Sequence, residues 1–77
     1  MDDNKAPRAV LIHREPIELS QLLKFAGLAE SGGDAKLSIT QGRVLLNGAV
    51  ETQKGKKLKA GDLVSLGGET VIVQVGA

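Results

Sequence analysis

The 77-residue chain has no cysteine, tryptophan or tyrosine, a single histidine, His13, and a single aromatic residue, Phe25. Without cysteine it can form neither a disulfide scaffold nor a thiolate metal site, and one histidine cannot supply a histidine-rich site. We therefore expect no metal and no other cofactor. Because Phe25 stands alone, the chain also cannot build the aromatic platform on which a β-sheet usually stacks the bases of a single strand.

Long apolar runs are missing as well. No stretch approaches the roughly 20 apolar residues that span a bilayer, and the N-terminal MDDNKAPRAV has neither the apolar core of a signal peptide nor an Arg-rich amphipathic pattern. We therefore expect a cytoplasmic protein that does not enter a membrane. A chain of this length buries only about 60% of the surface that it exposes when unfolded, so any site should lie on the surface.

Residues that catalyse reactions are scarce. His13 has no cysteine to activate, and none of the four serines lies in the G-x-S-x-G pattern of a nucleophile elbow. Glu30 and Asp34 form a carboxylate pair of the kind used in acid–base catalysis, but Asp34 is better explained as a helix cap. Gly32 and Gly33 lack the G-x-x-x-x-G-K-[ST] spacing of a nucleotide-hydrolysing loop. We expect a protein that is not an enzyme.

The apolar pattern predicts a mixed α+β fold. An apolar run indicates a first strand over residues 8–12. A helix from Glu18 is indicated by four apolar residues at the period of a helix that buries one face: Leu19, Leu22, Leu23 and Ala26. Gly27 suits the left-handed position that ends a helix. We expect a flexible N-terminus over residues 1–7 and a single, monomeric domain over residues 8–77.

The segment Ser31–Asp34 predicts the start of a second helix. Its S-x-x-[DE] spacing is that of a capping box, in which the serine oxygen accepts from the third helical amide and the acid reaches back to the amide of the cap. This helix should begin at Gly32 or Gly33 and end near Gln41, where Gly42 supplies the left-handed residue.

From residue 43 onward the apolar period drops to two, which predicts strands. Val44 and Leu46 should face the core, Leu45 should face outward, and Asn47-Gly48 should form a hairpin turn. Further strands are expected at residues 49–52, 63–66 and 70–75, with a basic loop at 54–59 and a turn at Gly67-Gly68. The expected architecture is two short helices packed on a small, mainly antiparallel sheet of about four or five strands.

Basic residues gather in one segment, although the net charge is only +1. Between residues 43 and 61 there is one acid, Glu51, and there are five basic residues: Arg43, Lys54, Lys56, Lys57 and Lys59. Such clustering matters more than the total, because a polyanion responds to the local potential of a patch. The alternative is that the lysines only keep a surface loop solvated.

The start of the second helix indicates an anion-binding surface. A helix N-terminus presents unpaired amides and a positive dipole end, and Gly32 and Gly33 let a phosphodiester approach the backbone. Lys36 adds charge one turn into the helix. The alternative is that the glycines only shape the turn between the helices. With so few aromatic residues, a nucleic acid would be recognised through phosphates, 2′-hydroxyls and shape, which favours structured RNA.

A set of short motifs spreads over residues 17–64, most of the chain. They are Leu19-x-x-Leu22-Leu23-Lys24, Ser31-Gly32-Gly33-x-Ala35-Lys36-x-x-Ile39, Gly42-x-Val44 with Asn47-Gly48, Glu51-Thr52, and Lys57-Leu58-x-x-Gly61-Asp62-x-Val64. Together they resemble the S4 RNA-binding domain family, and most closely the short stand-alone bacterial S4-like proteins of the YbcJ type.

The resemblance implies an alpha-L motif of two helices and a strand, followed by β-strands. It also implies that structured RNA, such as rRNA, tRNA or a ribosomal particle, binds across the helices and the basic loop. The implied RNA-binding residues are Lys24, Ser31, Gly32, Gly33, Lys36, Arg43, Asn47, Lys54, Lys56 and Lys57.

The chain departs from the family pattern at several positions. Gln53 stands where an arginine is expected, and Gly55 interrupts the basic run, so fewer contacts to RNA are expected. Leu37 and Leu45 occupy positions that are often polar in the family, and they leave room for a protein partner.

Two other functions stay open on the sequence. The tail from Val44 resembles the β-grasp sulfur carriers, which end in a flexible Gly-Gly whose carboxylate is activated. This chain ends in Gly76-Ala77, and its Gly67-Gly68 is internal. The remaining possibility is a small adaptor that docks on a protein partner through Leu37 and Leu45.

Overall fold

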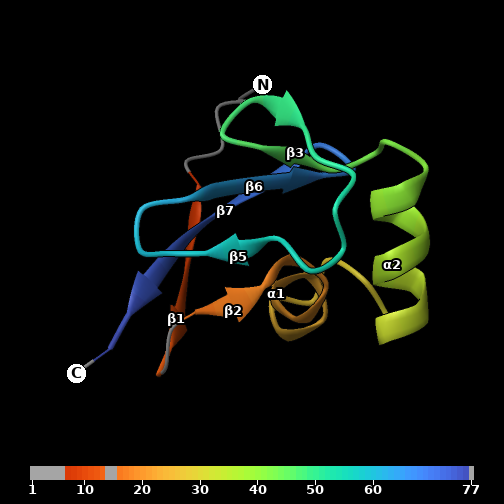
Figure 1. The fold of residues 1–77 in the computed structure, drawn as a ribbon. Coiled ribbons are helices and arrows are strands. Elements are labelled where there is room, and N and C mark those ends of the chain that lie inside the picture. The colour runs from red at the N-terminus through yellow and green to blue at the C-terminus, as the bar shows by residue number, and fades with distance from the viewer. Residues whose placement is uncertain (1–6, 14–15, 77) are drawn as a thin grey trace.

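Two helices and seven strands form the described part of the chain, residues 7–13 and 16–76 of a computed structural model (Figure 1). In chain order they are β1 (Arg8–Ile12), β2 (Ile17–Glu18), α1 (Leu19–Phe25), α2 (Gly32–Thr40), β3 (Leu45–Leu46), β4 (Ala49–Val50), β5 (Lys57–Leu58), β6 (Leu63–Leu66) and β7 (Glu69–Val75). The predicted flexible N-terminus, residues 1–7, lies outside the described residues except for Pro7.

Five of the strands form one mixed sheet in the order β1-β7-β6-β3-β4. The first and last strands of the chain, β1 and β7, pair in parallel, and the three other pairs are antiparallel. The expected mainly antiparallel sheet is therefore confirmed. The strands predicted at residues 8–12, 63–66 and 70–75 are present as β1, β6 and β7.

The turn between β3 and β4 has the conformation that its sequence predicts. Asn47 and Gly48 have φ values of 52° and 87°, as the type I′ turn of a tight hairpin requires. Val44 is fully buried and Leu46 packs against the core, as predicted. Leu45, expected to face outward, alternates with Val44 and Leu46. It is half-buried on an inner strand that β4 and β6 flank on both sides.

Helix α1 starts one residue after its predicted first residue. Glu18 precedes it in extended conformation, and the Glu18 amide donates to Gln21 Oε1 at 3.0 Å. The predicted apolar stripe is buried: Leu19, Leu22 and Leu23 are 0% exposed. The helix ends at Phe25, and Gly27 follows with the left-handed φ of 78° that its position predicts.

Helix α2 begins and ends where the sequence predicts. Ser31 Oγ accepts from the Asp34 amide at 3.1 Å, which confirms the serine half of the capping box. Gly42, with φ of 75°, follows the C-terminal cap at Gln41. α2 packs against α1, and its own contribution to the core is Ala35 and Ile39.

A second sheet of two strands is a feature that the sequence did not predict. β2 pairs antiparallel with β5, with Ile17 opposite Leu58 and Glu18 opposite Lys57. The sequence assigned Glu18 to the first helix and Lys57 to a loop, and both assignments were wrong. Two strands of two residues each leave no periodic signal, and their pairing depends on contacts between parts of the chain that lie 39 residues apart.

The hydrophobic core joins both helices to the inner face of the large sheet. Its buried apolar residues are Val10, Ile12, Leu19, Leu22, Leu23, Ala26, Ala35, Ile39, Val44, Leu58, Val64, Val71 and Val73. Among the residues that the structure describes, four large apolar ones are exposed: Leu11, Phe25, Leu37 and Val50. Within the described ranges, neither helix is long and apolar enough to cross a membrane.

Candidate nucleic-acid interface

The N-terminus of α2 is a stretch of backbone without side chains. A Cβ built on Gly32 would meet no atom within 4 Å, and one built on Gly33 would meet only Ser31 Oγ, at 3.8 Å. Neither glycine has a positive φ. Neither packing nor backbone conformation therefore requires glycine at these positions, which weakens the alternative that they only shape the turn between the helices.

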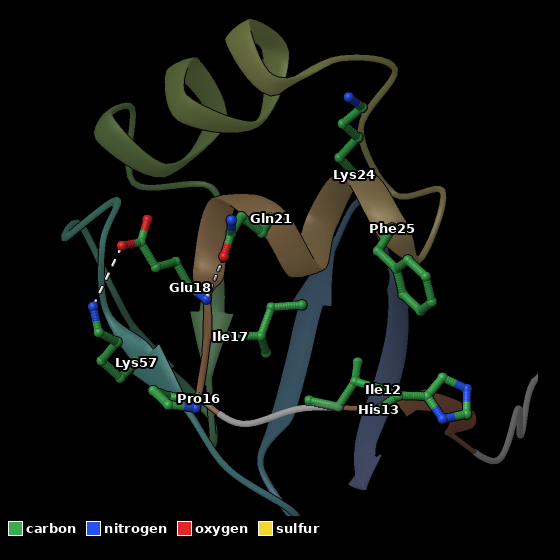
Figure 2. A pocket seen from close by; sticks show the side chains of 9 residues that line it. All are labelled: Ile12, His13, Pro16, Ile17, Glu18, Gln21, Lys24, Phe25 and Lys57. Carbon is green, nitrogen blue, oxygen red and sulfur yellow. Dashed lines mark hydrogen bonds and ion pairs between the residues drawn. The ribbon is translucent and has the colours of Figure 1, made fainter. Parts of the chain in front are cut away.

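Two lysines lie beside this backbone. Lys24 is in the last turn of α1, and Lys36 lies one turn into α2, so both belong to the end of the helix pair where the chain passes from α1 to α2. Both are exposed, and neither forms an ion pair with a described residue. Lys24 rises from α1 on the side opposite to the Phe25 ring (Figure 2). We call Lys24, Ser31, Gly32, Gly33 and Lys36 the helix-end cluster.

The basic segment is fixed at the other end of α1. The carbonyls of Lys54 and Lys56 accept hydrogen bonds from the amides of Ser20 and Leu19, at 3.2 and 2.8 Å. These bonds satisfy the first amides of α1, which have no partner within the helix. The side chains of Lys54 and Lys56 are exposed and form no ion pair within the described ranges. With Lys57, these residues form the loop cluster.

Two lysines of the basic segment have acidic partners. Lys57 Nζ lies 3.3 Å from Glu18 Oε2, in a pair whose side chains are 61% and 42% exposed. Lys59 Nζ lies 3.4 Å from Asp62 Oδ1. The positive potential of this segment is therefore weaker than its count of lysines indicates, although solvent screens the exposed Lys57–Glu18 pair.

The side-chain amide of Asn47 forms hydrogen bonds within the chain. Its Nδ2 donates to Asp62 Oδ1 at 3.2 Å, and its Oδ1 accepts from the Leu63 amide at 2.9 Å. Burial alone would raise the pKa of the Asp62 carboxyl. Hydrogen bonds from the Lys59 amide, Asn47 and the Lys59 ammonium have the opposite effect and are stronger, so the pKa of Asp62 is lowered from 3.8. These bonds connect Asn47 to the turn that contains Asp62. The predicted contact of Asn47 with RNA rests on the resemblance alone.

The predicted residues thus fall into two clusters with α1 between them. α1 has seven residues, so it is about 10 Å long, and the helix-end cluster and the loop cluster lie at its opposite ends. Arg43 belongs to neither: it is exposed in the link from α2 to β3 and forms no ion pair with a described residue. The structure does not bring the basic segment to the N-terminus of α2.

An open groove of about 780 Å³ lies under α1, and no sequence pattern predicted it. Phe25 and His13 lie at one end, Pro16 and Lys57 at the other, and Ile17 between them (Figure 2). The remaining lining residues are Ile12, Glu18, Gln21 and Lys24. The groove depends on the β2–β5 pairing, which brings Lys57 opposite Glu18, and so no local pattern could have revealed it.

No group of three or more metal-binding side chains occurs within residues 7–13 and 16–76, and the polar side chains buried there all have hydrogen-bond partners. The chemistry that these surfaces offer is the binding of anions by backbone amides and lysines.

Comparison with known proteins gives consistent results. "Putative RNA-binding protein YbcJ" of Escherichia coli K12 is 49% identical over 57 residues, which cover 74% of this chain and 81% of YbcJ. "Probable ribosome maturation protein RlbA" of Bacillus subtilis 168 is 39% identical over 59 residues, which cover 77% of this chain and 83% of RlbA.

The solved structure of a relative has the same fold. The solution structure of YbcJ from E. coli, described as revealing an alpha-L motif involved in RNA-binding, matches with a TM-score of 0.69 and 39% identity, over 96% of this chain and 95% of that one. The expected S4-like architecture is thereby confirmed. Residues 10–74 also match the sequence profile of the S4 domain, and the chain therefore belongs to the S4 domain family.

Proposed function

We propose that this protein is a non-enzymatic module that binds structured RNA through phosphates and shape. The observation that carries the proposal is the glycine pair at the N-terminus of α2. Glycine in a helix costs about 0.5–1 kcal/mol relative to alanine, and here neither packing nor φ requires it. Close approach of a phosphate to the Gly32 and Gly33 amides accounts for both residues.

The rest of the interface supplies charge on either side of α1. In the helix-end cluster, Lys24 and Lys36 stand beside the open amides, and in the loop cluster Lys54 and Lys56 extend into solvent. Since α1 is about 10 Å long, one RNA of modest length reaches both clusters. Arg43 adds a further cation along the path from α2 into the sheet.

The names of the relatives support this function and suggest its setting. YbcJ is named as RNA-binding and RlbA as a ribosome maturation protein. We propose ribosomal RNA, or a ribosomal particle, as the target, with tRNA as the second choice, and a monomer acting in the cytoplasm.

The test is the salt dependence of binding to a hairpin RNA, with charge-matched variants. If three or four phosphates are engaged, log K against log salt should have a slope of about −2 to −4. Lys36→Gln should weaken binding and flatten the slope. Gln74→Glu removes the same net charge at an exposed position of β7, away from both clusters, and should change little. A slope near zero, or equal effects of the two variants, would contradict the proposal.

A protein partner is a second candidate because Leu37 on α2 is 55% exposed. Leu45 does not extend this surface, since it is half-buried in β3. The sulfur-carrier alternative loses support at the C-terminus: the Gly76 amide donates to the Ile12 carbonyl at 2.8 Å, so this glycine is attached to β1 and does not form a free tail.

A further inference from the structure

The groove under α1 combines an apolar floor with a basic edge. Ile12 and Ile17 provide apolar surface, and Phe25 is 61% exposed above them, the only aromatic ring in the chain. A volume of about 780 Å³ falls within the roughly 300–1,000 Å³ that is usual for sites that hold small ligands. The groove can therefore accept a planar, partly apolar group.

The charges around the groove favour an anion. Among the described residues, three charged ones line the groove: Lys57, Glu18 and Lys24, whose ammonium group points away from it (Figure 2). The Glu18 carboxylate is paired with Lys57 at 3.3 Å. Lys54 and Lys56 extend the positive surface beyond Lys57. A ligand with a planar ring and a negatively charged backbone matches the Phe25 ring, the apolar isoleucine surface and the nearby lysines.

The groove is continuous with the proposed RNA interface. Lys24 belongs to the helix-end cluster and Lys57 to the loop cluster, and both line the groove. An RNA that contacts both clusters across α1 would therefore also pass along the edge of the groove. This continuity favours RNA over a peptide as the occupant.

We propose that the groove holds one unpaired nucleotide of the bound RNA, with its base stacked on the Phe25 ring. The inference rests on the proposed RNA-binding function and narrows its target to structured RNA that carries a bulged or looped-out nucleotide near the contacted phosphates. Stacking of a base on one aromatic side chain contributes sequence-tolerant affinity, since every base has a π-face.

Polar side chains that line the groove provide contacts for the edge of the base. Gln21 Oε1 accepts from the Glu18 amide at 3.0 Å, which orients its side-chain amide and leaves the NH₂ group as a donor. The imidazole of His13 lies at the same end of the groove as Phe25 (Figure 2). The base edge therefore meets both donors and acceptors.

The experiment uses two hairpin RNAs that differ by one nucleotide: a fully paired stem, and the same stem with a single bulged 2-aminopurine. On binding the wild-type protein, the fluorescence of the bulged base should fall, and the bulged hairpin should bind more tightly than the paired one. Phe25→Leu should abolish the quenching and weaken binding of the bulged hairpin by about 5- to 100-fold, with little effect on the paired hairpin. Phe25→Tyr, which keeps the ring, should behave as wild type.

The outcomes separate this inference from the proposed function. Because Phe25 is exposed, Phe25→Leu should fold normally, which a thermal melt checks. If both hairpins bind with the expected salt dependence but equally well, and Phe25→Leu changes neither, the groove does not hold a base and RNA binding stands. If neither hairpin binds in a salt-dependent way, the proposed function fails. If an acidic peptide shifts the Phe25 NMR signals and the bulged hairpin does not, the groove is a protein site and the inference is wrong.

Discussion

Asp62 illustrates how a single buried carboxylate ties the β5–β6 turn to the β3–β4 hairpin. It accepts from the Lys59 amide at 2.9 Å and from Asn47 Nδ2 at 3.2 Å. Its folded pKa lies below 3.8, so its contribution to stability is complete above pH 3.8 and is lost as the pH falls through the folded pKa. We expect Asp62→Asn to lower the free energy of unfolding at pH 7 by about 1.5–3 kcal/mol.

Urea unfolding of Asp62→Asn and wild type at a series of pH values measures this contribution. The difference between the two proteins should be constant from pH 7 down to about pH 4 and should shrink below that, as the wild-type carboxylate is protonated. A difference that persists unchanged at pH 2 would show that the charge of Asp62 is not what stabilises the turn.

Among the described residues, Glu18 is the acidic side chain that pairs with the loop cluster, and if Lys57 contacts RNA the two compete for its ammonium group. We expect Glu18→Gln to tighten RNA binding and to steepen the salt slope by up to about 0.9, the contribution of one more phosphate. Stability should change little, because exposed ion pairs contribute about 0–1 kcal/mol. Salt titrations of hairpin RNA binding measure the slope.

The control for Glu18→Gln is Glu69→Gln. It removes an equal charge from the other exposed pair that joins distant parts of the chain, Arg8 and Glu69, which lie 3.2 Å apart. If both variants tighten binding equally, the effect is one of net charge, and Lys57 is not a specific contact.

At the scale of elements, the N-terminus of α2 offers a test in which stability and binding move in opposite directions. Gly32→Ala should stabilise the fold by up to about 1 kcal/mol, because a Cβ there meets open space and the φ is ordinary. The same methyl group should hinder the phosphate, and losing a hydrogen bond to a charged group, about 1.5–3 kcal/mol, weakens binding about 10- to 100-fold.

Thermal melts and RNA titrations of the same Gly32→Ala sample check both effects. Gly42→Ala, at the other end of α2, should only destabilise, because Gly42 has a φ of 75° that side chains rarely adopt. If Gly32→Ala binds RNA as well as wild type, the glycine pair does not serve phosphate approach.

The elements that the sequence predicted well are those with local signals. The stripe from Leu19 to Ala26, the Ser31 cap and the Asn47-Gly48 turn each depend on residues within a few positions of one another, and all are present. The β2–β5 sheet depends on a contact between distant segments, so the sequence assigned its residues elsewhere. The groove and the Glu18–Lys57 pair follow from that sheet and were missed for the same reason.

For the molecule as a whole, the position of the basic segment matters more than its charge. The resemblance implied that RNA binds across the helices and the basic loop, and this stays a prediction. In the structure, the basic segment caps the N-terminal end of α1, away from the link to α2. The distance between the clusters is set by the length of α1, a property of the folded chain. We propose that a single RNA contacts both clusters across α1.

If one RNA contacts both clusters, the two clusters should contribute independently to its binding. Lys36 and Lys56 form no ion pair with a described residue, and α1 separates their clusters by about 10 Å, so their effects should add within about 0.5 kcal/mol. We expect Lys36→Gln and Lys56→Gln each to flatten the salt slope by about 0.9, and the double variant to flatten it by about 1.8. Salt titrations of the three variants with one hairpin RNA measure this. If the double variant matches either single variant, the RNA touches only one end of α1, and the loop cluster serves the fold rather than binding.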